Sequence, residues 1–83
     1  MYLTDSQYQT VKPLARELYE LIHPYKNDGE KAIRKAYPDI VNKEKELNDT
    51  LKELTGNDKE YNLIGHLIGT LPIRQHLNML ISF

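Results

Sequence analysis

The residues best suited to metal chemistry are two histidines, His66 and His76, which lie ten positions apart near the C-terminus. Together with a carboxylate, two imidazoles could supply most of a tetrahedral zinc site. However, the chain has no HxxxH or HxxE spacing, and no acidic residue follows Glu60. The third histidine, His23, precedes a proline at the end of a helical pattern, where a positive charge favours the helix dipole. We therefore expect no metal site and no cofactor.

The chain offers little for covalent catalysis. Its two serines, Ser6 and Ser82, lie near the ends of the sequence, and it has no cysteine. The glycine motifs that cradle phosphate or expose a nucleophile are absent from the sequence. Neighbouring carboxylates such as Glu17 and Glu20 fall among lysine and arginine residues, as is common on solvated helix surfaces. We therefore expect a non-enzymatic protein.

A second set of residues could contact DNA. Residues 63–80 have the outline of a helix-turn-helix unit, with Gly69 at the turn. On the second helix of that unit, Arg74, Gln75 and Asn78 are residue types that hydrogen-bond to base edges. Arg74 is nevertheless the one cation of this stretch, and the net charge of the chain is −1, whereas DNA-binding domains are usually basic. DNA binding is therefore the alternative function, and nucleic acid is not the expected partner.

A third set of residues suits protein binding. The chain has six tyrosines, one phenylalanine and no tryptophan, and tyrosine favours interfaces because its ring is apolar and its hydroxyl is polar. The C-terminal segment 61–83 carries one charged side chain and twelve apolar or aromatic ones, so it must form either core or interface. From these two groups we predict the following partner-contacting residues: Tyr2, Tyr8, Tyr25, Met79, Ile81 and Phe83.

The elements that would position these residues are helices. Apolar residues recur at helical spacing between the prolines, and no segment shows the alternation typical of strands. The first helix either spans 5–23 with a bend at Pro13 or begins at Thr10. The third spans 38–55 and ends at Gly56, a residue suited to a left-handed cap. Its charged residues, Glu44 among them, are expected to face solvent.

Three capping boxes predict where other helices begin. In such a pair, two side chains three residues apart each bond to a free backbone N–H group. The pairs are Thr4 with Gln7, Asn27 with Glu30, and Asn57 with Glu60. They predict the starts of the first, second and fourth helices, and a fifth helix is expected over 72–82, capped by Thr70. The G-x-x-x-G spacing of Gly65 and Gly69 favours close approach of another helix, in this chain or in a partner.

Together these patterns predict one domain, 1–83, that is all-α and forms a small antiparallel bundle of four or five helices without strands. The 61–81 segment should pack against the first and third helices. No run of about 20 apolar residues predicts a membrane span, and no signal peptide is visible, so a cytoplasmic location is expected. The predicted function is to bind an unidentified protein as an inhibitor, immunity or adaptor module. So much apolar surface could also support a homodimer.

Overall fold

Amphipathic helices account for nearly all of the described chain. The computed structural model describes residues 3–68 and 72–81, which form five α-helices, one 3-10 helix and no strand. The elements are α1 (Asp5–Ile22), η1 (His23–Asp28), α2 (Glu30–Ala36), α3 (Pro38–Thr55), α4 (Leu63–Leu67) and α5 (Ile73–Ile81). The predicted all-α helical bundle is therefore confirmed.

The start of α1 follows directly from its sequence. The backbone N–H of Gln7 donates to the Thr4 hydroxyl over 3.1 Å, and the Thr4 N–H donates to the Gln7 side chain over 3.0 Å. This is the predicted capping box. The helix continues through Pro13, whose ring is exposed, so the longer of the two predicted first helices is the one observed.

The bounds of α3 also match the prediction. Pro38 occupies the first turn, where its missing N–H costs no hydrogen bond. Gly56 ends the helix with a φ of 68°, and its N–H donates to the carbonyl of Lys52. A left-handed residue at this position is strongly favoured as glycine because a side chain would be strained there.

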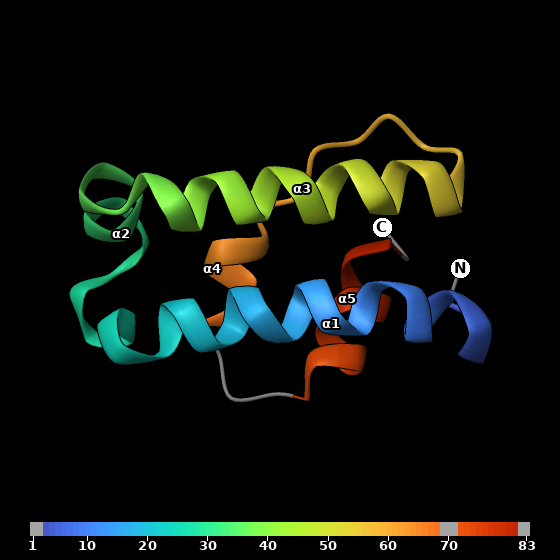
Figure 1. Ribbon diagram of the computed structural model, residues 1–83, viewed down its shortest axis with the longest axis horizontal. Helices are drawn as coiled ribbons and strands as arrows, with labels where there is room; N and C mark the ends of the chain where they lie inside the picture. Colours follow the sequence, from blue (N-terminus) through green and yellow to red (C-terminus); the bar gives the residue numbers. More distant parts are fainter. Residues whose placement is uncertain (1–2, 69–71, 82–83) are drawn as a thin grey trace.

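The two long helices α1 and α3 run antiparallel and form the frame of the molecule (Figure 1). Residues of η1 and α2 connect them at one end. The short helices α4 and α5 lie against one side of this pair, with α4 in contact with both long helices and α5 in contact with α1 and α4. The molecule measures 32 × 23 × 22 Å. The predicted packing of the C-terminal segment against the first helix is thus observed for both α4 and α5.

The core lies between the two long helices and the C-terminal pair. All five α-helices and Leu3 contribute buried apolar side chains. Those from the C-terminal segment are Leu63, Ile64, Leu67, Leu77, Leu80 and Ile81. Half of the twelve apolar or aromatic side chains of this segment are therefore buried, and Tyr61, Ile68 and Ile73 pack partly buried against the core. In the part of the chain that the structure describes, no helix is both long enough and apolar enough to cross a membrane.

The predicted capping box at the start of the second helix is wrong. Helix α2 begins at Glu30 and is preceded by Gly29, which provides no side-chain cap. Asn27 lies instead inside η1. The Glu30 carboxylate accepts a hydrogen bond from Arg34, one turn later on the same helix. A charge-assisted bond of this kind competes with capping for the same carboxylate oxygens.

The predicted start of the fourth helix is also wrong. Helix α4 begins at Leu63, and residues 56–62 cross the surface without helical structure. The Asn57 side chain accepts from the N–H of Lys59, which makes a local turn. Glu60 pairs with Lys52 on α3 instead of reaching back to Asn57. The predicted cap at Thr70 lies outside the described residues.

Candidate functional site

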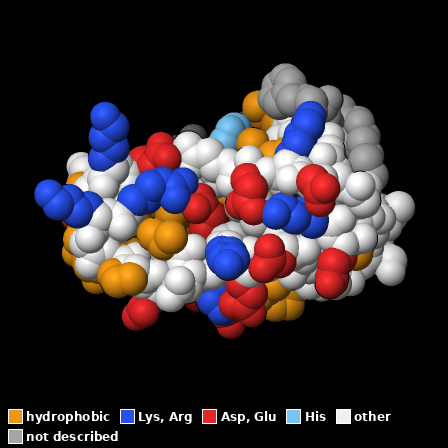
Figure 2. Space-filling view, turned by 90° about the horizontal axis from the view of Figure 1, so that it is seen from above, with side chains coloured by type: hydrophobic (Ala, Val, Ile, Leu, Met, Phe, Trp, Pro, Cys, Tyr) orange, Lys and Arg blue, Asp and Glu red, His pale blue; other side chains and the backbone are white. Residues whose placement is uncertain are grey.

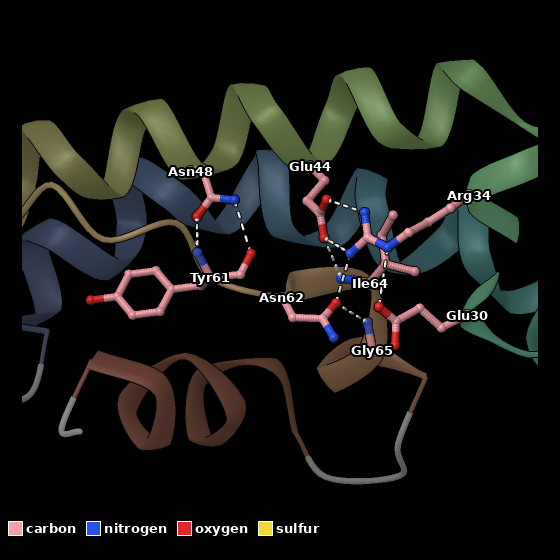
Figure 3. A network of polar contacts seen from close by, with 8 residues as sticks. All are labelled: Glu30, Arg34, Glu44, Asn48, Tyr61, Asn62, Ile64 and Gly65. Carbon is pink, nitrogen blue, oxygen red and sulfur yellow. Dashed lines mark hydrogen bonds and ion pairs between the residues drawn. The ribbon is translucent and has the colours of Figure 1, made fainter.

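The most highly connected polar group of the molecule surrounds Arg34 (Figure 3). Its guanidinium donates to both oxygens of the buried Glu44 carboxylate over 2.7 and 2.8 Å. Its Nε donates to Glu30 over 3.1 Å. Because the planar guanidinium matches a carboxylate in geometry, a two-bond pair of this kind is both strong and directional. The pair fixes α2 against α3.

The same group caps α4. Asn62 precedes this helix. The oxygen of its side-chain amide accepts from the N–H of Gly65 over 3.0 Å and from the guanidinium of Arg34 over 2.7 Å. The Glu44 carboxylate accepts from the N–H of Ile64 over 3.0 Å. The first N–H groups of a helix have no partner within it. Here two side chains from outside the helix supply partners for two of them.

Polar side chains lie close to the glycine at the third position of α4. A Cβ placed on Gly65 would lie 2.6 Å from the Asn62 amide nitrogen and 2.9 Å from a carboxylate oxygen of Glu30. The close approach expected for Gly65 is therefore observed within the chain, where it accommodates polar side chains. Gly69 lies outside the described residues.

A buried amide, Asn48, holds the chain just before α4. The Asn48 side chain is 2% exposed. It donates to the carbonyl of Tyr61 over 3.0 Å and accepts from the N–H of Tyr61 over 2.9 Å (Figure 3). Both backbone polar groups of one residue are thus satisfied by one amide. We call the set Glu30, Arg34, Glu44, Asn48 and Asn62 the polar clamp.

The electrostatics of the polar clamp are those of a satisfied structural network. Hydrogen bonds from Asn62 and then Arg34 lower the pKa of Glu30. Hydrogen bonding to Glu44 raises the pKa of Arg34 above its ordinary range. Both Glu44 oxygens are engaged by donors, so neither is left to move a proton during a reaction. This arrangement positions helices and is not suited to acid–base catalysis.

The expectation that Glu44 faces solvent is wrong, and the polar clamp was not predicted. A signal was present in the sequence, because Glu44 and Asn48 follow Ile40 at spacings of four and eight, in line with the apolar stripe of this helix. A charged residue within such a stripe indicates a buried partner elsewhere in the chain.

The two histidines singled out for metal chemistry do approach each other. The rings of His66 and His76 lie 6.2 Å apart between centroids and are nearly perpendicular. His76 is 5% exposed, and among the described residues neither of its ring nitrogens has a hydrogen-bond partner. Burial and, to a smaller extent, the neighbouring His66 lower the pKa of His76. Within residues 3–68 and 72–81, no group of three or more potential ligand side chains could hold a metal ion.

Two of the three residues predicted to contact DNA make contacts inside the chain. Arg74 pairs with the Asp5 carboxylate and lies over the Tyr8 ring, 4.8 Å from its centroid. The Asn78 side chain accepts from the N–H of Leu3 over 3.0 Å. Gln75 is exposed. These contacts hold the N-terminal segment on α5, and DNA binding by this helix stays a prediction.

The predicted partner-contacting residues are dispersed over the molecule. Tyr2 and Phe83 lie outside the described residues. Ile81 is 6% exposed and belongs to the core, so its side chain is not available to a partner while α5 is packed. Tyr8 is half-buried beneath Arg74. Met79 is 39% exposed on α5.

Tyr25 lies in η1, at the opposite end of α1 from Tyr8, and belongs to an aromatic cluster. Its ring stacks on Tyr37 with 4.0 Å between centroids and 20° between planes. Partial burial, with a smaller contribution from Tyr25, raises the pKa of Tyr37. Four residues before Tyr25, Leu21 is 38% exposed and borders a shallow depression with Glu17 and Glu20. We call Leu21, Tyr25 and Tyr37 the tyrosine end.

Comparisons of the chain with protein-family models, with curated proteins and with solved structures found no match. Function therefore has to be argued from the residues and their arrangement.

Proposed function

We propose that this chain is a non-enzymatic module that binds another protein, of the inhibitor, immunity or adaptor type, and that its contact surface includes the tyrosine end. The observation that carries the proposal is the stacked pair of half-buried rings, Tyr25 and Tyr37, with the exposed Leu21 four residues before Tyr25. Aromatic side chains lose little conformational freedom on binding and offer a large contact area. They are therefore efficient anchors for a partner.

The distribution of exposed apolar residues supports this location. Among the described residues, the large aliphatic side chains that are exposed are Leu21 and Met79. Leu21 precedes Tyr25 by four residues at the end of α1, whereas Met79 lies on α5. An exposed leucine alone needs no explanation. An exposed leucine at the same end of the chain fold as two half-buried aromatic rings supplies the residue types found at interface centres.

The test compares two variants matched in exposure and charge change. Tagged wild-type protein, Leu21→Glu and Met79→Glu are each incubated with an extract of the host cells, with and without nuclease. Captured proteins are then identified by mass spectrometry. We expect one stoichiometric protein that survives nuclease treatment, is retained by Met79→Glu and is lost with Leu21→Glu. Circular dichroism on both variants checks that the helices remain folded.

The opposite pattern would move the contact surface. A partner lost with Met79→Glu and kept by Leu21→Glu would place the interface on α5. Recovery of nucleic acid, with all captured proteins lost after nuclease, would favour the DNA-binding alternative. Capture of no protein by the wild type would remove the support for a binding module.

A further inference from the structure

The charges of this chain are unevenly distributed. Of its 11 cationic side chains and 12 carboxylates, residues 23–37 hold four cations and two carboxylates. Residues 49–60 hold two cations and four carboxylates. The first stretch forms η1, α2 and the residue that follows, whereas the second lies at the far end of α3 (Figure 1). Residues 23–37 therefore carry a net positive charge and residues 49–60 a net negative charge, although the net charge of the chain is −1.

The positively charged stretch, residues 23–37, includes Tyr25 and Tyr37 of the tyrosine end. Lys26 directly follows Tyr25, and Lys31 and Lys35 lie one turn apart on α2. All three lysines are exposed, and none forms an ion pair with any described residue. In Figure 2, the end of the molecule that α2 forms carries Lys and Arg side chains together with hydrophobic ones and some Asp and Glu, and charges of both signs alternate along the rest of this face.

Two lysines of α3, in contrast, form ion pairs within the chain. Lys43 pairs with Glu17 and Glu46, and Lys52 pairs with Glu60. These pairs raise the pKa of each lysine, chiefly through the hydrogen bond to Glu17 and to Glu60, respectively. Cations that neutralise carboxylates of their own chain attract a partner weakly. The lysines of the tyrosine end keep their charge available.

We infer that the tyrosine end binds an acidic peptide segment of the partner protein, with apolar side chains of that segment on Leu21 and its carboxylates facing Lys26, Lys31 and Lys35. This inference rests on the proposed function and names the chemistry of the partner. Opposite charges around an apolar centre set the orientation of a complex and raise its association rate. They also make binding weaker as ionic strength rises.

An acidic peptide fits this surface better than a nucleic acid does. Three lysines give few contacts for a continuous phosphate backbone, on which nucleic-acid affinity depends. Tyr25 and Tyr37 also cover one face of each other's ring, which removes those faces as platforms for stacked bases. A peptide can place separate carboxylates at the lysines and leave the other positions neutral.

The experiment is a titration of ¹⁵N-labelled protein with defined probes, followed by amide chemical shifts. The test probe is a short synthetic peptide of glutamates with interspersed leucines. The matched probe replaces each glutamate by lysine, and a third probe is single-stranded oligothymidylate. We expect the acidic peptide alone to shift the amides of Leu21, Tyr25 and Tyr37. The combined variant Lys31→Glu with Lys35→Glu should weaken binding about tenfold, whereas Lys45→Glu, an exposed site on α3, should leave it unchanged.

Several outcomes would overturn the inference. Equal binding of the lysine peptide, or binding of oligothymidylate to the same amides, would exclude an acidic peptide as the specific ligand. The protein could instead self-associate, and Lys31→Glu with Lys35→Glu could abolish that association. This result would identify residues 49–60 of a second copy, and not a peptide of another protein, as the ligand. If the captured partner is lost with Leu21→Glu but retained by Lys31→Glu with Lys35→Glu, the proposed function stands and this inference fails. If neither set of changes affects the partner, both fail.

Discussion

Two buried titratable side chains of this molecule, Glu44 and His76, are accommodated in opposite ways. The Glu44 carboxylate accepts two hydrogen bonds from Arg34 and one from the N–H of Ile64. His76 is buried to a similar degree, and within the described part of the chain neither of its ring nitrogens has a partner. A buried charge is tolerable where donors surround it, whereas a buried group without partners must stay neutral. The first site fixes geometry, and the second makes the molecule sensitive to acid.

The difference originates in what each side chain faces. Glu44 lies on α3 opposite the start of α4, where free N–H groups need acceptors. His76 lies on α5 among the apolar side chains of the core, and its polar neighbour in the described structure is the His66 ring. Burial of equal extent therefore has different consequences at the two sites.

The largest effect should come from removing the guanidinium of the polar clamp. Arg34→Met keeps much of the apolar side-chain volume but leaves the Glu44 carboxylate buried without its two strongest donors. Because breaking a buried ion pair strands the remaining charge, we expect a loss of about 3 kcal/mol in the free energy of unfolding. Urea unfolding followed by circular dichroism measures it.

The double variant Arg34→Met with Glu44→Leu provides the control. It removes both charges, so it should recover most of the stability lost in Arg34→Met alone. A loss below about 0.5 kcal/mol in the single variant, as is usual for exposed pairs, would show that the Glu44 carboxylate does not depend on Arg34.

The next largest effect is expected at Asn48, the buried amide that bonds to the backbone of Tyr61. Asn48→Ala leaves both the N–H and the carbonyl of Tyr61 without partners, and we expect a loss of about 2 kcal/mol. Asn42→Ala, at an exposed site of the same helix, tests for a general effect of the substitution on helix stability and should change the unfolding free energy little. Equal urea midpoints of unfolding for Asn48→Ala and Asn42→Ala would contradict a specific role of Asn48.

A smaller effect, with a pH dependence, is expected at His76. Its pKa is lower in the folded state than the ordinary value of 6.5, so between these two values the unfolded chain binds more protons. Stability should therefore be fully present above pH 6.5 and fall as the pH decreases through this window. His76→Leu should remove the contribution of this histidine and stabilise the protein by about 1 kcal/mol at neutral pH, because the buried ring nitrogens lack partners.

Thermal melting across this pH range measures the effect of His76. His23→Gln, at an exposed site, is the matched control and should keep the slope of the wild type. If the melting temperature of His76→Leu depends on pH as steeply as that of the wild type, the acid sensitivity comes from other groups.

The smallest effect is expected at the exposed contact between α5 and the N-terminal segment. Arg74 is 41% exposed and its partner Asp5 is 89% exposed. Solvent screens such a pair, so Arg74→Ala should lower the unfolding free energy by about 0.5 kcal/mol. Chemical denaturation of Arg74→Ala, Asp5→Ala and the double variant separates the pair from other contributions. A coupling above about 2 kcal/mol would show that this contact resembles the polar clamp.

The features that sequence predicted correctly are those decided within a few residues. The Thr4 capping box, the proline that opens α3 and the left-handed Gly56 each depend on local backbone groups. The apolar periodicity likewise placed the C-terminal helices against α1. These signals sufficed for the fold class and for most helix bounds.

The polar clamp was missed because its contacts join residues distant in sequence. Arg34 and Glu44 are ten positions apart, Asn48 and Tyr61 thirteen, and Arg34 and Asn62 twenty-eight. Local pairing therefore misplaced the start of α4, which depends on groups brought together by the folded chain. Tyr25 was predicted to contact a partner from its residue type, because tyrosine favours interfaces, whereas its stacking on Tyr37 depends on the folded chain and was not predicted.

The contact between Leu3 and Asn78 spans 75 positions and therefore bears on the order in which the molecule assembles. Closing so long a loop costs more chain entropy than forming the neighbouring contacts of α1, η1, α2 and α3. The helical hairpin of α1 and α3 can gain stability early, while α5 docks against it later. Because the ion pair that joins α5 to the start of α1, Arg74 with Asp5, is exposed and weak, α5 should also open more often than the hairpin. The hydrogen exchange of its amides would then report the lifetime of the docked C-terminal helix.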